Sequence, residues 1–282
     1  MIKVNTFIVG APKAGTTSLY NYLNNHNEVC MSCIKEPNFF SSKEVSNLFY
    51  KATSINNVNS YQKLFPEEKI IIGEASVSYL FYEDVPKRIY DYNSKAKIII
   101  MLRHPIDRAF SHFLMDKRLG FCKLTFEQIL NNPNKYLQYF QQYLKLGLYH
   151  DQVKRYLDMF GCRQVKIILY EDFKKNSSQV MSDTFKFLKI NDISLDYEIH
   201  NPFLSPSNLF LDYLYKFKFV RRIVKTFLPL SLIKLIKFKF FESSSKPLIL
   251  KDTKQKLNDF YKDDVVQLEK LLKKDLSQWD IK

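Results

Sequence analysis

The sequence predicts an α/β fold of three layers, in which a central parallel β-sheet is flanked by helices on both faces. Short runs rich in Ile, Val and Leu alternate with helical patterns along the chain, and continuously apolar strands of this kind are typical of parallel sheets covered on both sides. The 282 residues are 46% hydrophobic, which is enough for one large core. We therefore expect a single domain over residues 1–282, with an α/β core at 1–200 and a helical C-terminal part at 201–282.

The expected elements follow one another from the N-terminus. Strand-like runs occupy residues 4–9, 70–72, 98–102 and 165–169. The spacing of apolar side chains predicts helices at residues 17–24, 85–92, 106–118 and 151–160. The same spacing recurs near the C-terminus and predicts a last helix docked on the core through Leu257, Tyr261, Val265, Leu268 and Leu272.

The charge of the chain favours an anionic partner. Lys and Arg outnumber Asp and Glu by 43 to 29, which gives a formal net charge of +14. Such an excess suits nucleic acid, an acidic lipid surface, an acidic polymer or a polyphosphorylated small molecule, although a lysine-rich composition can also serve solubility alone. The charge is spread along the chain and no nucleic-acid recognition motif occurs. We therefore expect no nucleic-acid partner.

One basic segment, residues 209–241, mixes Leu, Phe and Ile with Lys and Arg. It could lie on an anionic membrane surface or pack its apolar side on the sheet layer. Uncharged apolar stretches of about 18 residues, which a spanning helix needs, are missing from the sequence. The N-terminus shows no signal-peptide pattern. We expect a cytoplasmic protein that could contact the inner face of the membrane through this segment.

The four cysteines are too few for a disulfide framework in a chain of this length. Cys30 and Cys33 form a CxxC pair, but Cys122 and Cys162 stand alone. A four-cysteine zinc site would therefore lack its second pair. We expect reduced thiols and no metal site.

The stretch "IVGAPKAGTTSLY" at residues 8–20 has the features of a phosphate-binding loop. Gly10 and Gly15 have the spacing of a Walker loop between an expected strand and an expected helix, where backbone N–H groups can bind an anion. Nearby hydroxyl groups come from Thr16, Thr17 and Ser18. Thr16 stands where a nucleoside triphosphatase has its lysine, and Lys13 lies inside the loop, within reach of a 5′ phospho-anhydride. The alternative is a glycine turn before a helix with an exposed lysine.

A second anion site is predicted where "KIIIMLRHPIDRAFSHF" ends its strand. A magnesium-dependent nucleoside triphosphatase usually has an Asp there, whereas this strand ends in Arg103. Pro105 suits the start of a helix, and Ser111, about two turns later, could return beside the strand end. An arginine with a serine hydroxyl can bind a phosphate. Two phosphate sites without a metal carboxylate suit a nucleotide that carries a 3′-phosphate and a further group at its 5′ end.

These motifs resemble those of the sulfotransferases that use 3′-phosphoadenosine 5′-phosphosulfate (PAPS). "APKAGTTSL" resembles their 5′-phosphosulfate loop, and "LRHPIDRAFSHF" resembles the strand and helix that hold the 3′-phosphate. "KEPNFF" at residues 35–40 resembles an element of the carbohydrate branch, which includes the heparan sulfate sulfotransferases. "GLYHDQVKRYLDMFG", "VKIILYEDF" and "DLSQW" also match, each weakly, so that the resemblance spans nearly the whole chain.

The resemblance implies a P-loop-like fold with a nucleotide-binding core. It implies in-line transfer of the sulfuryl group from PAPS to a hydroxyl or amine of a carbohydrate or glycolipid, with PAP as product and no metal. Lys13 would stabilise the charge on the leaving phosphate oxygen, and Glu36 would be the general base, unless Glu36 only flanks a helix. The implied donor-binding residues are Pro12, Lys13, Ala14, Gly15, Thr16, Thr17, Ser18, Arg103, Ser111 and Lys246.

The sequence departs from the family pattern in "GEASVSYL" at residues 73–80. Ala75 replaces a lysine that the heparan-modifying enzymes carry there, which argues against a glycosaminoglycan-like acceptor. Glu74 remains as a second carboxylate that, like Glu36, could contact the acceptor and share or replace the base. Acceptor pockets are built from loops, and we expect residues 43–62 and 125–147 to form the walls. The alternatives are an atypical P-loop kinase or nucleoside triphosphatase and a non-catalytic protein that binds an anionic ligand.

Overall fold

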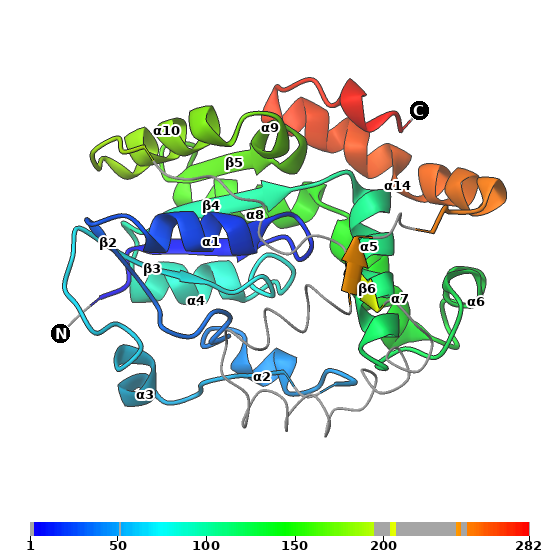
Figure 1. Ribbon diagram of the computed structural model, residues 1–282, viewed down its shortest axis with the longest axis horizontal. Coiled ribbons are helices and arrows are strands. Elements are labelled where there is room, and N and C mark those ends of the chain that lie inside the picture. The colour runs from blue at the N-terminus through cyan, green and yellow to red at the C-terminus, as the bar shows by residue number, and fades with distance from the viewer. Residues whose placement is uncertain (1–2, 51, 195–203, 207–240, 244–246, 282) are drawn as a thin grey trace.

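The computed structural model describes residues 3–50, 52–194, 204–206, 241–243 and 247–281 (Figure 1). Five parallel strands form its central sheet, in the order β2-β3-β1-β4-β5. They are β1 (Thr6–Gly10), β2 (Val29–Met31), β3 (Ile71–Ala75), β4 (Lys97–Leu102) and β5 (Val165–Leu169). The predicted α/β fold with a parallel sheet is confirmed. β2 was not predicted, because three residues are too few to show a pattern.

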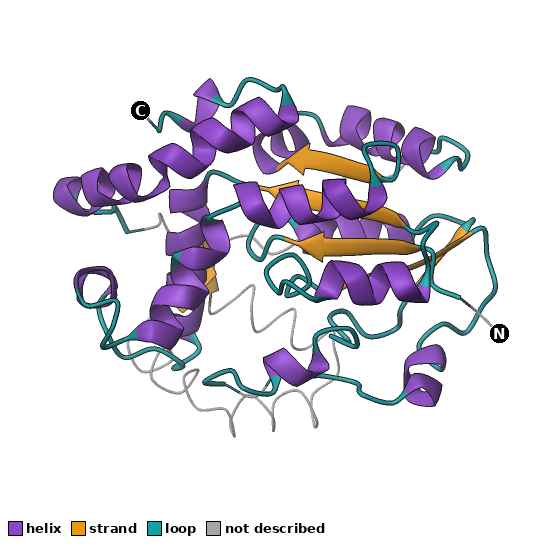
Figure 2. Cartoon of the chain, turned by 180° about the vertical axis from the view of Figure 1, so that it is seen from behind, coloured by secondary structure: helices purple, strands orange, loops and turns teal. Residues whose placement is uncertain are grey.

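Helices cover both faces of the sheet, as the views from the two sides show (Figures 1 and 2). One face carries α1 (Thr16–Asn24), α9 (Tyr170–Lys175) and α10 (Ser177–Leu188). The other carries α4 (Val85–Tyr92) and α8 (His150–Phe160), which pack on each other. Shorter helices lie in the connections, at α2 (Ser42–Val45), α3 (Val58–Gln62), α6 (Phe126–Asn131), α7 (Leu137–Tyr143), η1 (Lys145–Gly147) and η2 (Ser277–Trp279).

Helix α5 (Pro105–Arg118) leaves the carboxyl end of β4 and carries several groups of the site. Pro105 occupies its first turn, as predicted, because proline lacks the N–H that a helix start leaves unbonded. The N-cap is His104, whose side chain accepts the Asp107 N–H. The helix therefore begins directly behind Arg103.

The last long helix, α14 (Lys251–Leu272), docks on the core as predicted. Its fully or almost fully buried side chains are Leu257, Tyr261, Val265 and Leu268, while Leu272 is partly buried. It packs on α5 and α8. After it, Trp279 is fully buried, so the end of the chain also belongs to the core.

Most of the basic segment 209–241 lies outside the described residues, and its membrane contact stays a prediction. The division of the domain near residue 200 also falls on residues outside the description. On either side, β6 (Leu204–Pro206) and β7 (Phe241–Ser243) pair in antiparallel fashion. Among the described residues, no helix is long and apolar enough to cross a membrane, and no His, Cys, Asp and Glu side chains gather as metal ligands. Cys30 and Cys122 are buried, Cys33 and Cys162 are exposed, and all four are free.

Candidate functional site

The candidate site lies at the carboxyl ends of the parallel strands. β1 has β3 on one side and β4 on the other, so the connections of the chain change direction at β1. Ligands of open α/β sheets bind beside such a point. Lys13 follows β1 and Arg103 follows β4. Arg103 Nη1 donates to the Lys13 carbonyl oxygen at 3.1 Å. The two predicted phosphate sites are therefore neighbours.

The loop after β1 ends in an uncapped helix start. Gly15 is the N-cap of α1 in a left-handed conformation (φ 89°), and neither a capping side chain nor an acidic residue occurs in the first turn. Within the described residues, the backbone N–H groups of Gly15, Thr16 and Thr17 donate to no acceptor. Thr16 and Ser18 are buried, whereas Thr17 is half-buried. The unbonded donors and the positive end of the helix suit an anion.

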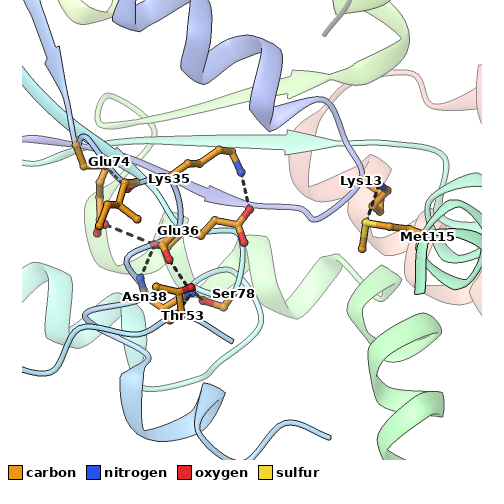
Figure 3. Close-up of polar contacts among 11 residues, drawn as sticks. Lys13, Lys35, Glu36, Asn38, Thr53, Glu74, Ser78 and Met115 are labelled. Carbon is orange, nitrogen blue, oxygen red and sulfur yellow. Dashed lines mark hydrogen bonds and ion pairs between the residues drawn. The ribbon is translucent and has the colours of Figure 1, made fainter. Parts of the chain in front are cut away.

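Lys13 is directed from this loop towards α5. Its backbone is in the left-handed region (φ 69°), and Nζ lies 3.3 Å from Met115 Sδ (Figure 3). Burial, followed by the charges of Arg108 and Lys13, lowers the pKa of His112 well below its ordinary value. Burial raises the pKa of Asp116 to about 6, against the opposing effects of the Tyr143 hydrogen bond and Lys13. The Lys13 ammonium therefore acts on the titration of two groups on α5.

Arg103 is held by an aromatic ring and is largely buried. Its guanidinium lies 4.7 Å from the centre of the Tyr170 ring, and its side chain is 12% exposed. Nη2 is 3.8 Å from Asp107 Oδ2, and the buried Nε has no hydrogen-bond partner in the part of the chain that the structure describes. Ser111 lies half-buried on α5, and its hydroxyl makes no hydrogen bond to a described residue. Binding of a ligand by Arg103 and by Ser111 stays a prediction.

Hydrogen bonds with Tyr149 and Glu171 support the backbone at Arg103 and His104. Tyr149 Oη donates to the Arg103 carbonyl oxygen at 2.9 Å. Glu171 accepts hydrogen bonds from the His104 N–H at 3.0 Å and from Trp279 Nε1 at 3.2 Å. The C-terminal turn is therefore tied to the loop that carries Arg103.

Glu36 lies in the loop after β2 and reaches the surface. Its side chain is 40% exposed, and Oε1 pairs with Lys35 Nζ at 2.5 Å (Figure 3). The backbone is left-handed (φ 64°) and is fixed by two hydrogen bonds, from the Glu36 N–H to Ala75 O at 2.8 Å and from Asn38 Nδ2 to Glu36 O at 3.0 Å. Strained conformations of this kind gather at functional sites, and both predicted catalytic residues have one.

Glu74 is placed differently from Glu36. Its side chain is fully buried on β3. Ser76 Oγ lies 3.5 Å from Oε2, and no described residue makes a hydrogen bond to Oε1. Burial raises the pKa of Glu74 to about 8, against the opposing effects of neighbouring hydroxyls, Tyr79 first. The structure therefore brings Glu36, and not Glu74, to the surface, and an acceptor contact of Glu74 stays a prediction.

Several side chains that lie at the site were not predicted from the sequence motifs. Tyr170 packs against Arg103, and a Cβ added at Gly15 would lie 2.9 Å from its ring. Met115 and Lys35 contact the two predicted catalytic side chains. Tyr170 directly follows β5, and a position at the end of a parallel strand is a signal that could have pointed to it. Lys246, predicted to bind the donor, lies outside the described residues.

The sequence pattern that defines the sulfotransferase domain matches residues 3–201. The chain belongs to the sulfotransferase family. This confirms the resemblance seen in the motifs, and the kinase alternative finds no support.

Relatives of this sulfotransferase include mouse carbohydrate sulfotransferase 15, which is 27% identical over 254 residues and matches 67% of this chain and 44% of that protein. Another is the Drosophila melanogaster bifunctional heparan sulfate N-deacetylase/N-sulfotransferase, at 27% over 217 residues, with 68% of this chain and 20% of that protein covered. The chain thus spans less than half the length of these relatives. A crystal structure of a sulfotransferase from Alicyclobacillus acidocaldarius is similar over 99% of this chain and 100% of its own, with a TM-score of 0.74 and 32% identity.

The buried carboxyl of Glu74 should make the stability of this sulfotransferase depend on pH. The pKa of Glu74 is about 8 in the folded protein and ordinary in the unfolded chain. Its contribution to the free energy of unfolding is therefore complete at low pH and is lost as the pH rises through 8. Glu74→Gln should therefore gain stability relative to wild type across this range, by at most about 1.4 kcal/mol per pH unit. Urea unfolding of both proteins at a series of pH values measures this, with Glu67→Gln, an exposed glutamate, as control. A difference that stays constant with pH contradicts the prediction.

The close approach of Gly15 to Tyr170 gives a second prediction. Gly15→Ala should destabilise the fold, because the new methyl group meets the ring at 2.9 Å and alanine strains the left-handed backbone. In a Tyr170→Ala background the clash is absent. Gly15→Ala should then lower the free energy of unfolding by about 1–3 kcal/mol less than it does in the wild-type background. Chemical denaturation of the four proteins of this cycle gives the coupling. Additive losses would show that the ring does not limit residue 15.

Proposed function

We propose that this protein transfers the sulfuryl group of PAPS to a hydroxyl or amine of a carbohydrate or glycoconjugate. Family membership supports the transfer, and the names of the relatives, which refer to carbohydrate and heparan sulfate, support an acceptor that contains sugar. The observation that carries the choice of donor is the direct contact between the loop after β1 and Arg103 after β4. Through this contact the two predicted anion sites would lie side by side, where the two ends of one nucleotide could reach them.

The donor would lie across this contact. The unbonded N–H groups at the start of α1 would receive the 5′-phosphate. The 3′-phosphate would bind Arg103, whose Nε has no partner among the described residues and whose fork suits phosphate oxygens. Lys13, inside the loop, would stabilise the negative charge that develops on the leaving phosphate oxygen. Ser111 and Lys246 would add contacts to the donor.

The acceptor would approach from the side of Glu36. As the acceptor oxygen or nitrogen forms its bond to sulfur, its proton would pass to the Glu36 carboxylate. The bond between sulfur and the phosphate oxygen would break with its electron pair retained by PAP. Lys35, paired with Glu36, would orient this carboxylate. Glu36 is suited to the role because it is partly exposed, in contrast to the enclosed Glu74.

The donor site can be tested by titration calorimetry with PAP. We expect binding that does not require magnesium and is stronger than that of ATP. Arg103→Ala should weaken it by about tenfold or more, as expected for the loss of a charge-assisted hydrogen bond. Lys87→Ala, which removes an exposed lysine on α4, should leave the affinity unchanged. A preference for ATP with magnesium over PAP would contradict the proposed donor.

Turnover separates the enzyme from a protein that only binds the nucleotide. With radiolabelled PAPS and a pool of oligosaccharides, Lys13→Ala should lower kcat by about 10²–10³-fold, the typical loss for a group that stabilises developing charge. Glu36→Gln should also lower kcat but retain the wild-type affinity for PAP, because its side chain would contact only the acceptor. Unchanged turnover in Glu36→Gln would exclude it as the base.

A further inference from the structure

A groove lies between the segment after α2 and helix α7. Its lining includes the rings of Phe49 and Tyr82 and the side chains of Glu44, Asn47, Gln138 and Gln141. Asn47 and Gln138 are exposed, and the other four are half-buried. Apart from Tyr82, these residues belong to the two regions expected from the sequence to form the walls of an acceptor pocket, residues 43–62 and 125–147.

The first wall starts directly beside Glu36. Asn38 Nδ2 donates to Thr53 O at 2.8 Å, and the Ile55 N–H donates to Pro37 O at 2.9 Å. These bonds close the neck of a loop whose outer part carries Glu44, Asn47 and Phe49 of the groove. A ligand that lies along this loop would therefore have one end near the Glu36 carboxylate.

The second wall is joined to the first by packed side chains. The Phe49 ring lies 4.5 Å from that of Tyr139 on α7. The Gln142 amide nitrogen is 2.9 Å from Tyr50 Oη and 3.0 Å from His112 Nε2 on α5. Burial, and then the charge of Asp116, raises the pKa of the Tyr50 phenol to about 12, with a smaller contribution from Glu36. The groove is thus rigidly connected to α5, the helix against which Lys13 rests.

The lining has the chemistry of a sugar-binding surface. Aromatic rings offer flat apolar faces with a polar edge, and the amides of Asn47, Gln138 and Gln141 can each donate and accept hydrogen bonds, as hydroxyl groups of a sugar do. Glu44 is the charged side chain among the described lining residues. Its Oε1 forms an ion pair with Arg88 Nη2 at 2.7 Å. This carboxylate is paired, and none of the described lining side chains is a cation, so the lining offers no positive charge to an anionic group.

We propose that this groove binds uncharged sugar units of the acceptor, adjacent to the unit that is sulfated beside Glu36. This inference rests on the proposed function and adds the class of acceptor and the residues that select it. Phe49 and Tyr82 stack on sugar rings, and Asn47, Gln138 and Gln141 bind their hydroxyl or acetamido groups. These contacts are remote from the reacting atoms and are made equally before and during transfer, so they tighten acceptor binding without changing the chemical step.

The groove assignment can be tested on a glycan array probed with the labelled protein in the presence of PAP. The array contains neutral, uronic acid-containing and sulfated oligosaccharides. We expect binding to neutral oligosaccharides. Calorimetry with the neutral oligosaccharide that binds most strongly then compares the variants. The double variant Gln138→Ala with Gln141→Ala should weaken this binding by about tenfold or more. Gln255→Ala, which removes an exposed amide on α14, is the matched control and should bind as wild type does.

The outcomes distinguish this inference from the proposed function. If wild type fails to bind PAP, the proposed function fails and the inference with it. If PAP binds normally but wild type binds only anionic glycans or none, or if the double variant keeps full affinity, the groove assignment alone is overturned. In transfer assays with the same neutral oligosaccharide, the double variant should raise KM and leave kcat near wild type, whereas a merely unfolded protein would lose PAP affinity as well.

Discussion

The parallel pairing of β1 with β4 is the constraint on which the site depends. Because both strands end at the same edge of the sheet, the loop that carries Lys13 and the residue that ends β4 lie next to each other, and Arg103 Nη1 reaches the Lys13 carbonyl oxygen. Tyr170, after β5, extends the row and packs on both Gly15 and Arg103. Three strands thus hold one cationic crevice, and helices on both faces keep the strand ends fixed.

The local features of this arrangement could be predicted from the sequence. The glycine spacing of the loop, the cation at the end of β4 and Pro105 at the start of α5 are all encoded within a few residues. Contacts between distant parts of the chain could not be predicted from the sequence. Lys13 and Met115 are 102 residues apart, and the short strand β2, which places Glu36, owes its existence to its pairing with β3. The enclosure of Glu74 likewise depends on packing around β3, which residue spacing does not reveal.

The site combines rigid support with local strain. Lys13 and Glu36 both adopt left-handed backbone conformations, which cost free energy for residues with a side chain. Hydrogen bonds to neighbouring segments, such as that of the Glu36 N–H to the Ala75 carbonyl, hold the chain in these conformations. The two side chains are thereby directed before any ligand arrives, and less conformational entropy is lost on binding.

The link from Trp279 through Glu171 to the backbone behind Arg103 has a thermodynamic consequence. An anion bound at Arg103, as proposed, would lie next to the backbone that this link holds, so its binding and the docking of the turn would be coupled in free energy. Coupling between two equilibria is reciprocal: whatever the docked turn adds to the affinity for an anion, the anion adds to the docking of the turn. The turn that carries Trp279 would therefore act as a distant part of the proposed nucleotide site.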